Sequence, residues 1–138
     1  MRRLAARALA ALGRGNVDLH VTLADDATIR RLHGRYLGDR HATDVLAFDL
    51  QGPGPSRLLG EVVVSVDTAR RQARRVRVPL SLELDLLVVH GVLHLVGYED
   101  GSPAEARAMH ERAREILSAR GRRARPIPGR LWHGLLPA

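Results

Sequence analysis

Hydrophobic and polar residues alternate over a short segment near the start of the chain. Single polar residues separate four apolar ones, Val17, Leu19, Val21 and Leu23. Since a period of two is typical of a strand with one buried face, we predict a strand over about 17–23. Two further apolar runs, 43–48 and 58–64, flank a link rich in glycine and proline. They predict two more strands, joined by a hairpin or a crossover.

The segments that follow the first and the third of these strands are each predicted to form a helix. Asp25 or Asp26 can cap a helix whose apolar residues recur every three or four positions and which Gly38 closes. Ser65 can cap a second helix, which we expect to end near 78–79 because the residue before a proline disfavours helical backbone. The first of these helices is expected to expose its arginines to water.

The segment after Pro79 is ambiguous at its start. Leucines at every second position from Leu80 to Leu86 suit a strand, whereas from Leu82 onward the apolar residues step by four and three. The apolar run is also too long for a typical strand. We therefore predict a buried helix that ends at Gly97.

The last predicted helix has the clearest start. Ser102, Pro103 and Glu105 supply an N-cap, a first-turn proline and a capping-box acid, and the helix is expected to run to about residue 119. A chain of 138 residues is long enough for one core, so we assign residues 1–120 to a single α+β domain. Residues 121–138 are rich in arginine, proline and glycine and are expected to form a C-terminal tail.

Composition restricts the compartment and the kind of metal site. The chain has no cysteine, which excludes a thiolate zinc site and fits a reducing compartment. Residues 1–7 are basic, but no apolar run or small-residue cleavage site follows them. The most apolar stretch, 86–96, is far shorter than the roughly 20 residues of a membrane span. We expect a cytoplasmic protein that does not cross a membrane.

The charge of the chain suits a polyanionic partner. The formal net charge is +7, and all 22 basic residues are arginines, although genome bias can also produce such a composition. Five arginines crowd a segment whose only acid is Asp67: Arg70, Arg71, Arg74, Arg75 and Arg77. This density suits phosphate contacts. The aromatic content of 3% argues against a base-stacking platform.

Two histidines on the predicted buried helix have the spacing of metal ligands. His90 and His94 are four residues apart, so their side chains leave the same helix face and can meet one ion at about 2 Å each. Gly97 lets the chain turn back, which allows Asp100 to present a third ligand. Three ligands with an open fourth position are typical of a catalytic zinc site. The alternative interpretation is that both histidines are buried and form hydrogen bonds to the backbone without binding a metal.

The spacing also resembles the extended zincin motif, in which a glutamate after the first histidine is the general base of a protease. Here that residue is Gly91, which cannot accept a proton, so peptide hydrolysis is the less favoured alternative. We expect four of the remaining histidines to be surface or structural residues: His20, His33, His110 and His133. The role of His41 is less certain.

The stretch from His90 to Asp100, HGVLHLVGYED, closely resembles the signature of the YbeY endoribonuclease family. Further matches in family order extend over about residues 17–117 and include Thr43-Asp44-Val45-Leu46 and Leu59-Gly60-Glu61-Val62. The resemblance implies a zincin-like, mixed four-stranded sheet packed with helices, with the metal site on a central buried helix. It also implies a zinc-dependent endoribonuclease, specific for single strands, that matures the 3′ end of 16S rRNA and acts in biogenesis of the small ribosomal subunit.

The chain departs from the family pattern near the implied site. The family's third metal ligand is usually a histidine where this chain has Asp100, and Glu99 replaces an aspartate. Leu37 replaces an arginine that is thought to face the substrate, and Arg40 is a candidate to reach the same space. A ribosome-associated RNA-binding protein without cleavage activity is therefore an alternative function.

Taken with these departures, the resemblance implies that His90, His94 and Asp100 bind one Zn²⁺ per chain. Glu99 competes with Asp100 for the place of third ligand. Arginines in the segment 70–77 are expected to position the RNA, and no residue is assigned as a general acid or base.

Overall fold

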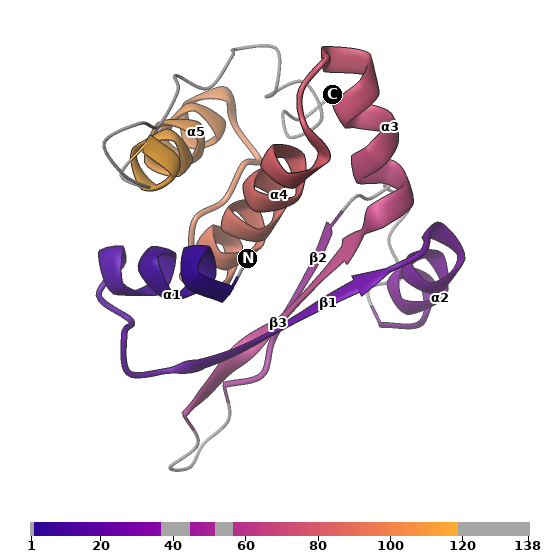
Figure 1. The fold of residues 1–138 in the computed structure, drawn as a ribbon. Helices are drawn as coiled ribbons and strands as arrows, with labels where there is room; N and C mark the ends of the chain where they lie inside the picture. Colours follow the sequence, from indigo (N-terminus) through magenta and orange to yellow (C-terminus); the bar gives the residue numbers. More distant parts are fainter. Residues whose placement is uncertain (1, 37–44, 52–56, 119–138) are drawn as a thin grey trace.

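The computed structural model describes residues 2–36, 45–51 and 57–118. Within these ranges the chain forms five helices and three strands (Figure 1): α1 (Arg2–Ala11), β1 (Asp18–Ala24), α2 (Asp26–Tyr36), β2 (Val45–Asp49), β3 (Leu58–Ser65), α3 (Val66–Val76), α4 (Leu80–Leu95) and α5 (Pro103–Ser118). The strands and the helices from α2 onward lie in the segments where the sequence pattern predicts them.

The three strands form a mixed sheet in the order β1-β3-β2. β1 runs parallel to β3, with Val21 beside Val62, whereas β2 runs antiparallel to β3, with Val45 beside Val64. The predicted α+β class is confirmed. The part of the chain that the structure describes contains three strands, so the implied fourth strand is not confirmed.

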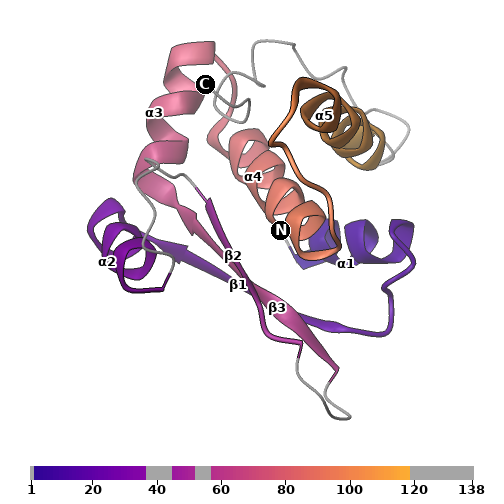
Figure 2. The same cartoon turned by 180° about the vertical axis from the view of Figure 1, so that it is seen from behind.

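Helices cover both faces of this sheet (Figures 1 and 2). α4 lies across one face with α1 and α5 beside it, and α2 packs against the opposite face. The larger core cluster lies between α4 and the inward-facing residues of β3, which include Val62 and Val64. A smaller cluster under α2 contains Ile29, Leu46 and Val63. The alternation of Val62, Val63 and Val64 between the two clusters explains why β3 is apolar throughout.

α4 is buried on nearly all sides, and this accounts for its ambiguous sequence pattern. All residues from Glu83 to Leu95 except Leu84 and His94 are buried, so polar residues mark no clear exposed face. A helix that is apolar all round is typical of a core position. The helix begins at Leu80, two residues before the predicted start at Leu82.

Two glycines allow α4 to approach the sheet closely. A Cβ atom at Gly91 would lie 2.6 Å from Cγ1 of Val62 on β3. A Cβ atom at Gly60 on β3 would clash with the backbone oxygen of Phe48 and with the Leu95 side chain. The helix and the sheet therefore meet at a separation that leaves no room for a side chain at either position.

α1 is a helix that the sequence pattern did not predict, since its three arginines interrupt the apolar residues of the segment. Its buried residues are Leu4, Ala5, Ala8 and Leu9, and it packs against α4 and α5. The spacing of these four residues forms one apolar stripe, which was the available signal for a helix.

Side-chain caps confirm three predicted helix starts. Asp25, Ser65 and Ser102 each accept a hydrogen bond from the backbone N–H three residues further along, at 2.7, 3.1 and 3.1 Å. Such a bond satisfies one of the free N–H groups of the first helical turn.

A partly buried network of hydrogen bonds connects α2 to the start of α3. The carboxylate of Asp26 accepts hydrogen bonds from the hydroxyls of Ser65 and Thr68 and from Arg71, the last at 2.8 Å. These bonds, that of Ser65 first, lower the pKa of Asp26 from 3.8 to about 2. Asp26 thus remains charged and connects the start of α2 to the end of β3 and the first turns of α3.

None of the described helices is by itself long and apolar enough to cross a membrane. α3 and α4 pass such a test only as a pair bent by 120°, on length and composition alone. The burial of α4 within the fold accounts for its apolar character. The predicted tail, 121–138, lies outside the described residues.

We predict that Gly91→Ala destabilises the protein by about 1–3 kcal/mol, because the added methyl group overpacks the contact with Val62. Urea unfolding of the metal-free protein measures this change. Gly101→Ala is the matched control, since a Cβ atom at Gly101 meets no atom within 4 Å. Equal stability of the two variants would contradict the close approach of α4 to β3.

Candidate metal centre

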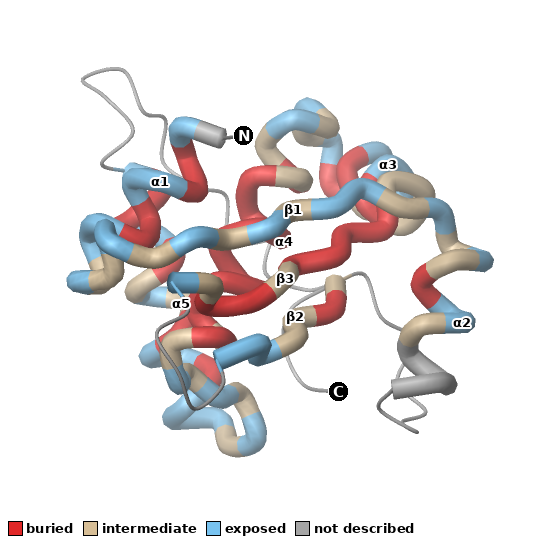
Figure 3. Tube along the Cα trace, turned by 90° about the horizontal axis from the view of Figure 1, so that it is seen from below, coloured by how far each residue is buried: buried red, intermediate tan, exposed pale blue. Residues whose placement is uncertain are grey.

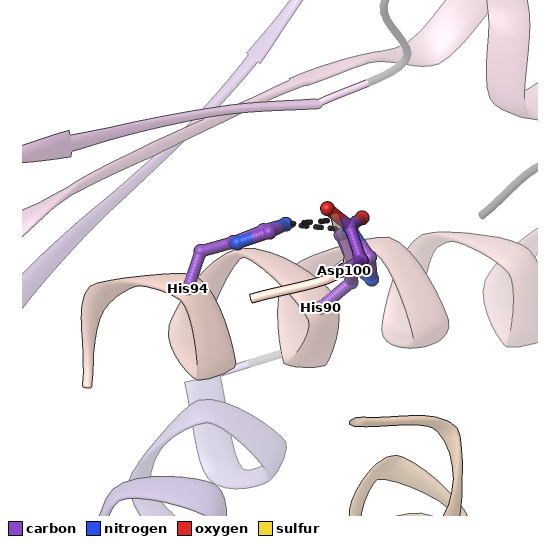
Figure 4. Close-up of side chains that lie close together, drawn as sticks. All are labelled: His90, His94 and Asp100. Carbon is purple, nitrogen blue, oxygen red and sulfur yellow. Dashed lines mark hydrogen bonds and ion pairs between the residues drawn. The ribbon is translucent and has the colours of Figure 1, made fainter. Parts of the chain in front are cut away.

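His90 and His94 point to the same side of α4, and Asp100 faces them from the loop that follows the helix (Figure 4). One ligand atom from each residue lies within 4.8 Å of the others. The structure therefore brings together the three residues that the sequence predicted as metal ligands.

The loop reaches this position through a glycine-dependent helix end. Gly97 has a φ of +106°, and the N–H groups of Gly97 and Tyr98 donate to the carbonyls of His94 and Leu93 at 3.1 and 2.9 Å. This is the Schellman pattern, in which a left-handed residue reverses the chain direction. The reversal returns residues 98–100 along the helix and places Asp100 opposite the histidines.

The distances within the cluster suit one ion. Nε2 of His94 lies 3.0 Å from Nε2 of His90, and Oδ2 of Asp100 lies 3.8 and 3.7 Å from the Nε2 atoms of His90 and His94. Two imidazole nitrogens on one tetrahedral zinc ion would be roughly 3.3 Å apart. The oxygen of Asp100 is close enough to both nitrogens for the three atoms to share one ion at about 2 Å each.

A second hydrogen bond orients the ring of His94. Its Nδ1 lies 3.1 Å from the backbone oxygen of Tyr98, and a carbonyl oxygen can only accept. Nδ1 of His94 therefore donates this hydrogen bond, and Nε2 is the ring nitrogen that faces the cluster. A backbone carbonyl on the distal nitrogen is a common outer-shell partner of a metal-binding histidine.

Burial keeps His90 neutral. Desolvation is the main cause that lowers its pKa from 6.5 to about 3, and the neighbouring His94 and His110 lower it further. The rings of His90 and His94 meet edge to face, with centroids 4.6 Å apart. Metal ligation needs unprotonated imidazole, so the environment of His90 selects the form that can bind an ion.

The carboxylate near the histidines belongs to Asp100, and Glu99 is exposed. Within the described residues, Asp100 is the acid that completes the three-residue cluster. The geometry thus favours Asp100 over its predicted competitor.

His110 is a residue that sequence reasoning had assigned to the surface or to a structural role. It lies on α5, and burial lowers its pKa while the charge of Asp100 opposes this effect. It also acts electrostatically on His90. Its position next to the buried Met109 on the inward stripe of α5 was the available signal.

The residue after the first histidine has no space for a catalytic side chain. The missing Cβ of Gly91 would point into Val62, so a glutamate there would need α4 to move away from the sheet. The packing therefore agrees with the sequence argument against a zincin-type protease.

The arginines predicted to contact RNA lie on α3 or at its C-terminal cap, and all five are exposed. Arg71 also forms an ion pair with Asp26 at 2.8 Å. Other residues named from the family pattern lie outside the described residues: Leu37, Arg40, His41 and Asp44.

Comparisons with a family model and with individual proteins identify the same family. The family model described as "Endoribonuclease YbeY" matches residues 2–121. Proteins named endoribonuclease YbeY from Anaeromyxobacter dehalogenans and Anaeromyxobacter sp. are 47% and 45% identical over 124 and 122 residues, which are 87% and 88% of this chain. The matched region is 64% of the length of each relative.

A further relative of the same name, from Aquifex aeolicus, is 46% identical over 93 residues, which are 67% of this chain and 62% of the relative. Among solved structures, the solution structure of TM1509 from Thermotoga maritima is similar, with a TM-score of 0.56 and 26% identity. The similarity covers 86% of this chain and 81% of that one.

We predict that the metal-free protein loses stability as the pH falls from about 6.5 towards 3. Over this range the unfolded chain protonates His90, whereas the folded protein, with its lowered pKa, does not. The loss attributable to His90 is at most about 1.4 kcal/mol per pH unit. Denaturant unfolding of wild-type and His90→Gln protein in chelator measures it. Parallel pH profiles for the two proteins would contradict the assignment.

Proposed function

Because this chain belongs to the YbeY endoribonuclease family, we propose that it is a metal-dependent endoribonuclease that cleaves single-stranded ribosomal RNA. The observation that carries the proposal is the cluster of His90, His94 and Asp100 at the end of a buried helix. It lies within the residues that the family model matches.

We propose Zn²⁺ as the ion, one per chain. Two neutral imidazoles and a carboxylate form a donor set that zinc accepts, with a fourth position left open. When bound, the ion supplies Lewis-acid polarisation of a phosphoryl oxygen. The carboxylate is a harder donor than the usual histidine and would widen the tolerance of the site to manganese.

The residues around this centre hold and orient the ligands. The Tyr98 carbonyl fixes the tautomer of His94, burial keeps His90 unprotonated, and the turn at Gly97 brings Asp100 to the histidines. Rigid, pre-oriented ligands lower the reorganisation that a reaction requires. In this arrangement the chain's own residues supply the geometry in which a bound ion would meet the substrate phosphate.

The exposed arginines of α3 are the proposed contacts for the RNA backbone. Each guanidinium group can donate two parallel hydrogen bonds to the oxygens of one phosphate. We propose further that the substrate is the 3′ end of 16S rRNA, that the small ribosomal subunit is the partner, and that the protein acts in the cytoplasm. The family and the positive charge of +7 support this proposal.

The direct test is cleavage of a single-stranded fragment of 16S rRNA by the purified full chain. We predict metal-dependent cleavage that chelator abolishes and that His94→Ala reduces more than about a hundredfold, because a ligand is lost. Glu99→Gln is the matched control and should retain most of the activity, since Glu99 lies outside the cluster.

Cleavage that persists in His94→Ala would overturn the proposal, because activity would then not require the cluster. Tight RNA binding without turnover by the zinc-loaded wild type would instead support an RNA-binding protein without nuclease activity. Hydrolysis of casein would support the protease alternative.

A further inference from the structure

The arginines of α3 differ in how their side chains are held. Figure 3 shows buried and exposed residues alternating along this helix, since one of its faces packs on the core. The exposed residues include four arginines: Arg70, Arg71, Arg74 and Arg75. Within the part of the chain that the structure describes, Arg71 is the one of these four that forms an ion pair or a side-chain hydrogen bond.

Arg71 is held through one nitrogen atom of its guanidinium group. Nη2 of Arg71 lies 2.8 Å from Oδ2 of Asp26 and 2.9 Å from Oγ1 of Thr68. The Thr68 hydroxyl donates its own hydrogen to Asp26, so its oxygen can accept one from Arg71. Nη2 carries two hydrogen atoms, one for each of these two acceptors. Both hydrogens of Nη2 are therefore used inside the protein.

These bonds occupy the atoms with which an arginine binds a phosphate most strongly. A guanidinium group binds two phosphate oxygens through a pair of parallel N–H groups. The pair is either Nε with Nη2 or Nη1 with Nη2, and both pairs include Nη2. While Arg71 is bound to Asp26 and Thr68, it therefore has no such pair for a phosphate. The carboxylate of Asp26 also offsets the charge of Arg71.

We propose that Arg70 and Arg74 are the residues of α3 that bind the phosphates of single-stranded RNA, and that Arg71 instead fixes α3 to the start of α2. At 3.6 residues per turn, Arg70 and Arg74 lie one turn apart on the side of the helix away from Thr68, with Cβ atoms about 5–6 Å apart. Both keep the paired N–H groups that Arg71 uses within the protein. This assignment rests on the proposed function, from which the RNA partner comes.

The salt dependence of RNA binding separates the two roles. Binding of a single-stranded fragment of 16S rRNA to the full chain is measured with chelator present, so that cleavage does not interfere. Each lost phosphate contact lowers the slope of log K against log salt by about 0.7 for a single strand. Arg70→Gln and Arg74→Gln should each show this loss, whereas Arg71→Gln should show less than about half of it. An equal loss in Arg71→Gln and Arg74→Gln would overturn the assignment.

Two double variants that keep the net charge of the wild type remove long-range electrostatics from the comparison. Asp26→Asn with Arg71→Gln removes one acid and one arginine, and should bind the RNA within about twofold of the wild type. Glu111→Gln with Arg74→Gln makes the same change in charge, because Glu111 is an exposed acid of α5. It should bind at least about fivefold more weakly, since a phosphate contact is lost. The reverse order of affinities would overturn the assignment.

Stability gives a readout that does not depend on RNA. Arg71→Gln should lower the midpoint of urea unfolding, because it removes the bonds to Asp26 and Thr68, whereas Arg74→Gln should not. A midpoint that falls only in Arg74→Gln would overturn the anchoring role of Arg71. Wild-type cleavage of the rRNA fragment together with unchanged binding in Arg70→Gln and Arg74→Gln would overturn this assignment and leave the proposed nuclease intact. A wild type that binds no RNA would overturn both.

Discussion

The close contact between α4 and β3 sets the geometry of the rest of the structure. Gly91 and Gly60 leave no space for a side chain, so the helix lies directly against the sheet. The two histidines flank Gly91 in sequence, one residue before it and three after it, and leave the helix to the side of this contact. The packing that stabilises the core thus also places His90 and His94 at the rim of the apolar interior, where ligands are held firmly and one side stays open.

Burial at this rim has an electrostatic consequence. A charged imidazole would lose its hydration there, so the pKa of His90 falls and the ring remains neutral. The chain supplies the negative charge from outside the helix, through Asp100 on the returning loop. Imidazole nitrogens bind a metal ion only when they are unprotonated, so the burial of His90 favours the form that can act as a ligand.

Much of the fold and of the site could be predicted from the sequence, because the signals were local. Ser65 and Ser102 act as caps wherever their helices pack, and His90 and His94 share a helix face by periodicity alone. Features that depend on tertiary contacts could not be read in this way. The arginines of α1 hid its apolar stripe, and the alternating leucines at the start of α4 suited a strand as well as a helix. The electrostatic effect of Asp100 on His110 depends on how α5 packs on α4.

We expect His90, His94 and Asp100 to bind one metal ion together. X-ray absorption at the zinc edge, on protein loaded with one equivalent of zinc, tests it most directly. We expect two imidazole nitrogens and a carboxylate oxygen at about 2.0–2.2 Å from the zinc, with a ligand set that changes in Asp100→Asn and stays the same in Glu99→Gln. A spectrum without imidazole scattering, or one that Asp100→Asn leaves unchanged, would contradict it.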